Sequence, residues 1–274
     1  MASLGDIIFY SMIVLIVLFS ALIILLLALA FSGESSEVSS TNTLPIANLG
    51  QDVVLSCFLN VKLELAKLRQ VSVTWEKEDL DGLVHRYVDG AADLVDQDSQ
   101  FKGRTQVFPE ALGSGNASLL MRDVRNSDAG QYTCRISSSE GGGMVNIQLR
   151  TAAFTAPNFK FSNGVLVAEA SRWFPKPNIT WSDEAGNVLN GTTSFTQNSA
   201  GIYRVVSTVQ AVNVSDTYTC RIENELVSAV SKATVTDTEV FRRTYFTFNA
   251  ASTLLASIYL STLATILYIY YLAS

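Results

Sequence analysis

The stretch from Asp128 to Cys134, which reads DAGQYTC, constrains the fold more than any other feature of this chain. Asp128 and Gly130 suit a tight turn that leads into a strand. Tyr132 and Cys134 are two residues apart, so their side chains point to the same face of that strand. A cysteine on the buried face of one sheet can bridge to a second sheet, and Cys57 lies on an earlier apolar strand. The pattern predicts a two-sheet β sandwich closed by a Cys57–Cys134 disulfide.

Trp75 lies between these cysteines on a run in which apolar and polar residues alternate. Immunoglobulin sandwiches pack a tryptophan at this place against the disulfide, and their tyrosine two residues before the second cysteine bonds back to the preceding corner. An additional strand pair, here expected around 83–88, separates the V type from the constant type. We therefore predict a V-type domain over 44–150 with Trp75 and Tyr132 in its core.

Three further expectations concern this first domain. The positions of Arg104 and Asp128 match two that commonly form a salt bridge at the bottom of V-type sandwiches, so we expect that pair here. His85, the single histidine of the chain, is expected on a solvated strand face. Residues 137–143 contain three consecutive glycines and are expected to form a mobile loop between the last two strands.

A second, constant-type domain is predicted over 151–238, because Tyr218 and Cys220 repeat the Tyr-x-Cys pattern and Trp181 repeats the core tryptophan. Its first cysteine is missing, since Ala168 stands at that position. With three cysteines in an exported chain, Cys220 is left without a partner. We expect a buried free thiol, and an intermolecular disulfide is the alternative.

The N-terminal end reads as an export signal. No residue from 7 to 31 is charged, and Ala28-Leu29-Ala30 resembles a cleavage site. Residues 1–30 are therefore predicted to be a signal peptide, or an uncleaved signal anchor because the apolar run is long enough to span a bilayer. Residues 31–43 are polar and are expected to form a disordered leader.

The C-terminal end reads as a membrane attachment. Residues 239–253 are expected to form a juxtamembrane stalk, and the uncharged run 254–273 is expected to be a transmembrane helix of a type I protein. Arg242 and Arg243 precede this run and no basic residue follows it, contrary to the positive-inside rule. A signal for a glycolipid anchor is therefore the alternative.

Composition and motifs exclude several classes of function. The net charge of −6 disfavours a nucleic-acid partner, and one histidine cannot form a multi-histidine metal site. No pattern for a nucleophile elbow, a zinc protease or a phosphate loop occurs. We expect a protein that is not an enzyme and has no cofactor, metal or small-molecule substrate. Four sequons predict a glycosylated surface protein, at Asn116, Asn178, Asn190 and Asn213.

Taken as a whole, the all-β pattern of two tandem immunoglobulin sandwiches, V-type then constant-type, resembles the butyrophilin-like co-signalling ligands of antigen-presenting cells. The resemblance covers the whole chain. It is carried by the domain landmarks and by the segments Gly82-Leu83-Val84-His85, Phe101-Lys102-Gly103-Arg104-Thr105, Gly115-Asn116-Ala117-Ser118-Leu119, Arg172-Trp173-Phe174-Pro175 and Arg221-Ile222-Glu223-Asn224.

The resemblance implies a plasma-membrane ligand that binds a receptor protein on T cells and restrains their activation, proliferation and cytokine output. It also implies a cis Phe174–Pro175 bond. Such ligands usually bind through one sheet of the V-type domain, whose outward residues by alternation are Thr74, Glu76, Arg86, Thr133, Arg135, Asn146 and Gln148. An adhesion molecule is the alternative. An accessory receptor subunit ranks last, because the C-terminal run carries no charge to pair with a signalling chain.

Overall fold

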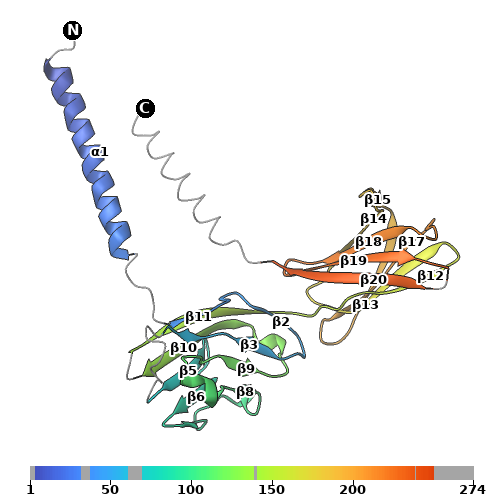
Figure 1. Ribbon diagram of the computed structural model, residues 1–274, viewed down its shortest axis with the longest axis horizontal. Coiled ribbons are helices and arrows are strands. Elements are labelled where there is room, and N and C mark those ends of the chain that lie inside the picture. The colour runs from blue at the N-terminus through green and yellow to red at the C-terminus, as the bar shows by residue number, and fades with distance from the viewer. Residues whose placement is uncertain (1–3, 32–37, 61–69, 139–140, 238, 250–274) are drawn as a thin grey trace.

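The computed structural model describes residues 4–31, 38–60, 70–138, 141–237 and 239–249. These residues form an N-terminal helix, α1 (Leu4–Phe31), and two β sandwiches that follow one another along the chain (Figure 1). The side chains described in α1 between residues 11 and 26 are all exposed. Within the described part of the chain, no helix is long and apolar enough to cross a membrane. The segment 254–273 lies outside the described residues, so the C-terminal attachment stays a prediction, as does the signal peptide or signal anchor over 1–30.

The first sandwich has a large sheet that faces a smaller one. In spatial order the large sheet contains β2 (Ile46–Asn48), β11 (Gly141–Ala152), β10 (Gly130–Ser138), β5 (Ser72–Lys77), β6 (His85–Val88) and β7 (Ala91–Ala92). The smaller side contains β3 (Val53–Leu55), β9 (Leu119–Met121) and β8 (Thr105–Gln106), together with the pair β1 (Val38–Ser39) and β4 (Phe58–Leu59). A short helix, α2 (Pro109–Leu112), joins β8 to β9. The strands β6 and β7 are the additional pair that marks the V type.

Alternation places one face of each central strand in the core of this sandwich. Trp75 from β5, Tyr132 from β10 and Leu119 from β9 are fully buried, as the spacing predicts. The core of the V-type domain is therefore built from the residues that alternation and the cysteine motif point to.

The expected disordered leader is wrong at its C-terminal end. Val38, at the start of β1, pairs with Leu59 and is fully buried. It lies beside Gly143: a Cβ on this glycine would come within 3.3 Å of the Val38 side chain. Most of the segment 31–43 is polar, but its Val38 is apolar and is buried in the core.

The expected glycine loop at 137–143 is also wrong for the residues described. Strand β10 continues to Ser138 and β11 begins at Gly141, so the glycines are paired strand residues. A Cβ on Gly142 would lie 2.5 Å from the carbonyl oxygen of Ile136. Glycine is therefore needed for close approach of the two backbones. Residues 139–140, and the helical turn expected within 61–69, lie outside the described residues.

The second sandwich is of the constant type and has nine strands, two more than the usual seven. One sheet contains β12 (Asn158–Ser162), β13 (Val165–Trp173), β17 (Tyr203–Val209) and β16 (Gly191–Gln197). The other contains β15 (Val188–Leu189), β14 (Asn178–Ser182), β18 (Thr217–Glu223), β19 (Val227–Val235) and β20 (Val240–Phe248). The Phe174–Pro175 peptide is cis, as the resemblance implies.

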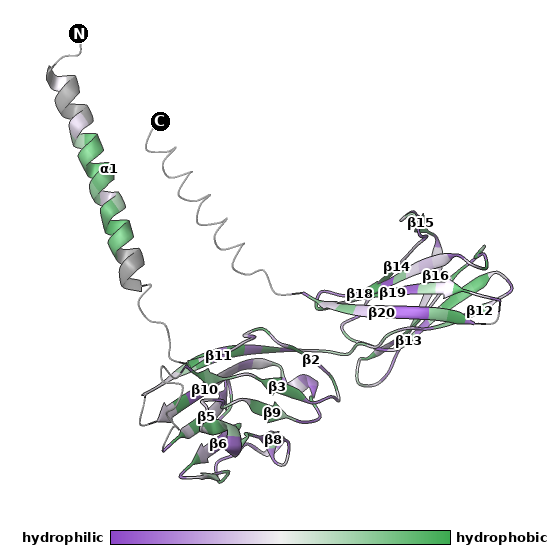
Figure 2. Ribbon diagram, viewed as in Figure 1, coloured by the Kyte–Doolittle hydropathy of each residue, from purple (hydrophilic) through white to green (hydrophobic). Residues whose placement is uncertain are grey.

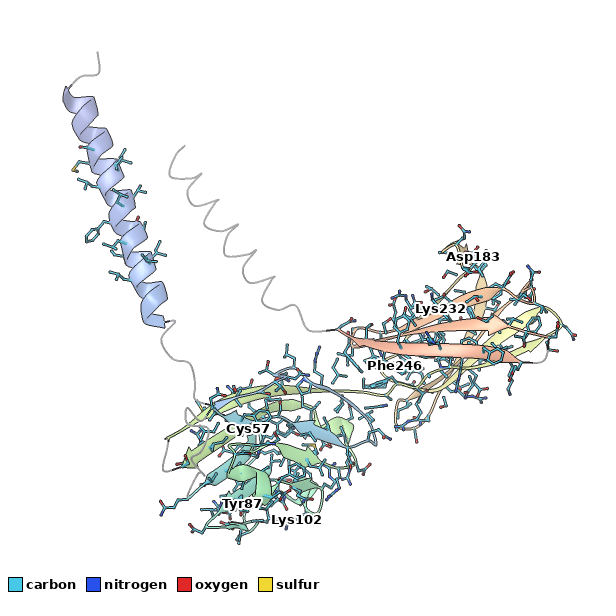
Figure 3. All side chains as sticks on the ribbon, in the orientation of Figure 1. Cys57, Tyr87, Lys102, Asp183, Lys232 and Phe246 are labelled. Atoms are coloured by element: carbon cyan, nitrogen blue, oxygen red, sulfur yellow. A yellow bond between two sulfur atoms is a disulfide. The ribbon has the colours of Figure 1, made fainter. Side chains whose placement is uncertain are left out.

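Strand β20 corrects the expectation of a stalk over 239–253. It pairs with the whole of β19, from Val235 opposite Val240 to Val227 opposite Phe248. Phe246 packs against the second core, with its ring centroid 5.3 Å from that of Phe154 (Figure 3). The boundary expected at 238 is therefore wrong, because the second sandwich continues through β20.

Candidate functional site

The outward face of the large V-type sheet gathers the seven residues predicted for receptor contact. Thr133 lies opposite Asn146 on β11 and Glu76 on β5. Arg135 lies opposite Thr74, which in turn lies opposite Arg86 on β6. Their neighbours along each strand, such as Trp75, are buried, so the register assumed from alternation holds. Strands β11, β10, β5 and β6 form one continuous surface, here called the front face, of Thr74, Glu76, Arg86, Thr133, Arg135, Asn146 and Gln148.

The two arginines of the front face differ in their partners. Arg86 is held by an ion pair with Asp93, through a bond from Nε to Oδ2 of 2.9 Å, and lies 3.5 Å from Asp96. Arg135 is exposed and has no carboxylate partner among the described residues. Arg135 is therefore the cation of this face that a partner protein can engage without breaking an internal contact.

One end of the front face is acidic. The turn from β5 to β6 contains Glu78, Asp79 and Asp81, and these residues line a hollow of about 430 Å³ in which Lys77 is the one cation. The exposed cation and this acidic turn give the face two poles of opposite charge, which can orient a partner.

Met144 was missed as a member of the front face. It lies opposite Arg135 and is 50% exposed, which makes it the large apolar side chain beside the free cation. Alternation could have found it, because Met144 is two residues before Asn146 on the same strand.

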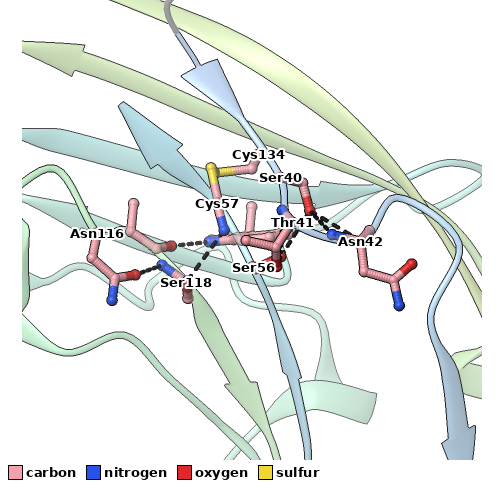
Figure 4. The surroundings of a disulfide bond; sticks show 10 residues. Ser40, Thr41, Asn42, Ser56, Cys57, Asn116, Ser118 and Cys134 are labelled. Atoms are coloured by element: carbon pink, nitrogen blue, oxygen red, sulfur yellow. Dashed lines mark hydrogen bonds between the residues drawn. A yellow bond between two sulfur atoms is a disulfide. The ribbon is translucent and has the colours of Figure 1, made fainter. Parts of the chain in front are cut away.

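A disulfide joins the two sheets behind this face, between Cys57 and Cys134, with an S–S distance of 2.01 Å (Figure 4). Trp75 lies opposite Cys134 on the adjacent strand, and its Nε1 donates to the carbonyl oxygen of Ala117 at 3.0 Å. The backbone N–H of Cys57 donates to Ser118 Oγ at 3.1 Å (Figure 4). The predicted disulfide is thus surrounded by satisfied polar groups.

A buried ion pair closes the corner from which β10 starts. Arg104 donates to both carboxylate oxygens of Asp128, at 2.7 and 2.9 Å, and Asp128 is fully buried. The hydrogen bond to Asp128 raises the pKa of Arg104. Tyr132 Oη donates to the backbone carbonyl of Asp128 at 2.6 Å, and burial raises the pKa of this tyrosine. This corner holds β10, and so Thr133 and Arg135, in place.

The expectation of a solvated His85 is wrong. His85 is only 4% exposed, because it pairs with Trp75 in register and shares its inward direction. Its Nδ1 lies 3.1 Å from Thr105 Oγ1, whereas Nε2 has no hydrogen-bond partner. Burial lowers the pKa of His85 below its usual value.

The core of the second domain lacks a disulfide. Ala168 and Cys220 are both buried in its core, where Cys220 is the free cysteine of the described residues. Burial raises the pKa of the Cys220 thiol to about 12, so the thiol stays protonated at neutral pH. Trp181 is buried and its Nε1 donates to Ser207 Oγ at 2.8 Å. Tyr218 Oη accepts a hydrogen bond from the Asn213 backbone at 3.0 Å.

The four predicted glycosylation sites differ in exposure. Asn178, Asn190 and Asn213 are exposed on the second domain. Asn116 is half-buried on the first domain, and its Oδ1 accepts a hydrogen bond from the Ser118 N–H at 3.0 Å. Glycosylation stays a prediction at all four positions.

Several contacts between the two domains were not foreseen from the sequence. Arg172 of the second domain donates to the carbonyl oxygen of Leu49 at 2.6 Å. Asn48 exchanges two hydrogen bonds with the backbone of Phe154, at 3.0 and 3.2 Å. In the part of the chain that the structure describes, no group of three or more His, Cys, Asp or Glu residues could hold a metal ion.

Two family models match the chain. The immunoglobulin V-set domain matches residues 41–151, and the immunoglobulin C-type domain of the butyrophilin subfamily 3 member A2-like group matches residues 160–232. Rat V-set domain-containing T-cell activation inhibitor 1 is 38% identical over 252 residues, which cover 89% of this chain and 88% of the relative. The chain belongs to the V-set domain-containing T-cell activation inhibitor 1 family.

A human relative is similar to the same extent. The human T-cell activation inhibitor 1 is 37% identical over 254 residues, covering 89% of each chain. A crystal structure of the human B7-H4 IgV-like domain is 36% identical and covers 43% of this chain and 98% of that domain, with a TM-score of 0.38.

Proposed function

We propose that this chain is a cell-surface co-signalling ligand that binds a receptor on T cells and restrains their activation, proliferation and cytokine production. Its similarity to T-cell activation inhibitors over 89% of the chain carries this proposal. The receptor contacts the front face of the V-type domain, with Arg135 and Met144 near its centre. An exposed arginine beside an exposed apolar side chain is a composition that interface centres favour.

The test uses T cells stimulated by presenting cells that carry the full chain at graded surface densities. Density-dependent suppression of proliferation and cytokine release is the expected result. Enhanced proliferation contradicts the inhibitory sign. Unchanged proliferation, combined with aggregation of the expressing cells, supports the alternative of an adhesion molecule.

The front face is tested with a matched pair of charge reversals. Arg135→Glu is expected to weaken receptor binding at least about tenfold, because it reverses the free cation at the centre of the face. Arg122→Glu is the control, since Arg122 is also an exposed arginine and follows β9 in the other sheet. Both variants are first compared for surface expression. Equal loss of T-cell suppression in both variants would place the contact elsewhere.

A further inference from the structure

Strand β20 returns the chain to the junction between the two domains. Strand β19 runs away from this junction, and β20 pairs antiparallel along its whole length, which is about 30 Å for nine residues. At the end of β20 the backbone of Asn249 bonds to both domains. Its N–H donates to Leu226 of the second domain at 2.9 Å, and its carbonyl accepts from Nη1 of Arg150, in the last V-type strand, at 3.0 Å.

The expected membrane attachment therefore starts from the junction and not from the far end of the second domain. The apolar run begins at residue 254, five residues after Asn249. Five extended residues reach at most about 18 Å. The junction lies within that distance of the membrane if the run inserts, whereas an exit after β19 would leave the whole second domain between the membrane and the V-type domain.

Strand β20 lies at the free edge of its sheet, and its exposed side chains are of the aromatic and basic types that contact lipid headgroups. Phe241, Tyr245 and Phe248 are 59%, 49% and 53% exposed. Arg243 is exposed between the first two, and no acidic residue occurs from 240 to 274. We call Phe241, Arg243 and Tyr245, which alternate along one face of β20, the edge strip. Phe248 lies on the opposite face, where its ring centroid is 5.6 Å from that of Phe154. Figure 2 shows hydrophobic colour on both sides of the hydrophilic stretch of β20.

Exposed edge strands normally have features that prevent pairing with strands of other molecules. Arg242 is one such feature here. Its Nη1 donates to the Pro157 carbonyl and to Asn158 Oδ1, both at 2.6 Å, and so ties the edge of one sheet to the start of β12 in the other. The two aromatic side chains of the edge strip, Phe241 and Tyr245, point away from this contact and are 59% and 49% exposed. Aromatic rings next to arginines are the side chains that favour the membrane–water interface.

We propose that the edge strip lies against the phospholipid surface of the membrane, so that the C-type domain lies along the bilayer instead of standing on it. This inference rests on the membrane attachment in the proposed function. Aromatic rings of the edge strip reach the headgroup level, and Arg243 contacts lipid phosphates. The V-type domain is then presented beside the membrane, close to the point where the chain enters it.

The test places a single added tryptophan on the edge strip of the full chain in phosphatidylcholine–phosphatidylserine vesicles. Tyr245→Trp is the reporter and Phe241→Trp, on the same face, is the second. The native Trp75, Trp173 and Trp181 are at most 2% exposed, so they give a constant background. The control is Val188→Trp, which is 80% exposed on β15 at the opposite edge of the same sheet.

Lipids that carry bromine on the acyl chain near the headgroup are expected to quench the emission of both reporters about twofold, since these rings lie at the headgroup level. They are expected to leave the Val188→Trp emission unchanged. Absence of quenching at both reporters, in a chain that floats with the vesicles, overturns this inference alone. A chain that does not float with vesicles overturns both this inference and the membrane attachment of the proposed function.

Discussion

The two sandwiches of this protein have the same architecture but are stabilised by different interactions. The V-type domain has a disulfide between its sheets and a buried ion pair at its corner. The C-type domain has Ala168 where a cysteine would stand, a free Cys220, and an ion pair, Arg204–Glu169, that is exposed. It has instead an additional strand, β20, whose Phe246 extends the core.

This difference shows that a covalent bridge is one of several ways to hold two sheets together. In the C-type domain, the burial of apolar side chains holds the two sheets together, whereas in the V-type domain the disulfide contributes to this. We therefore expect the V-type domain to resist unfolding more than its neighbour, and its stability to depend more strongly on a few residues.

The largest effect is expected for Cys57→Ala. The lost bridge closes a loop of 77 residues, and its removal costs about 4 to 5 kcal/mol in the chain-entropy model. Surface delivery of the full chain should fall to a small fraction, measured by flow cytometry. Cys220→Ala is the control and should keep most of its surface expression. Near-normal delivery of Cys57→Ala would show that the bridge is dispensable.

A loss of about 3 kcal/mol is expected for Asp128→Ala, because the change leaves the buried guanidinium of Arg104 without its partner. The measurement is the denaturant midpoint of the V-type transition. Glu169→Ala removes the exposed pair of the C-type domain and should cost less than about 1 kcal/mol. Similar costs in the two variants would contradict the contrast between the domains.

A gain of about 2 kcal/mol is expected for Ala168→Cys, which places a cysteine in the core that contains Cys220. The new disulfide should raise the unfolding midpoint of the C-type domain toward that of the V-type domain. Mass spectrometry without reductant checks that the bridge forms, and the same variant with dithiothreitol is the control. If the bridge forms but the unfolding midpoint does not rise, the packing of the core already provides the stability that the disulfide would add.

The smallest effect is a pH dependence confined to the V-type domain. Burial lowers the pKa of folded His85, so the unfolded state binds the proton more readily than the folded state. The stability contributed by neutral His85 is present above the unfolded pKa, about 6.5, and is lost as the pH falls below it toward the folded pKa, by at most about 1.4 kcal/mol per unit.

Thermal unfolding between pH 7 and 5 checks this prediction, because His85 is the one histidine of the chain. The V-type transition should move to lower temperature while the C-type transition stays. His85→Gln should remove the difference between the domains. A parallel shift of both transitions would assign the effect to other groups.

Local patterns were sufficient for much of the V-type domain. The spacing of Cys57, Trp75, Tyr132 and Cys134 predicted a buried core that the structure contains, and alternation placed the outward residues of β5, β10 and β11 on one face. These inferences succeeded because side-chain direction in a strand follows from the backbone alone. The expectation of a solvated His85 was wrong although alternation points to its burial, since the next residue, Arg86, lies on the outward face.

The amino-acid sequence by itself determined that the chain forms two sandwiches, which residues of the central strands are buried, and that Cys220 has no cysteine partner in its domain. Only the tertiary structure decided that Val38 enters the core, that the three glycines lie in a strand, and that 240–248 forms β20 on the second sandwich. The glycines lie in a strand because β10 and β11 pair directly as a hairpin. The other two placements depend on the surface that a distant segment presents: Val38 fits beside Gly143, and Phe246 packs against Phe154. Such contacts join residues far apart in the chain, and no local period records them.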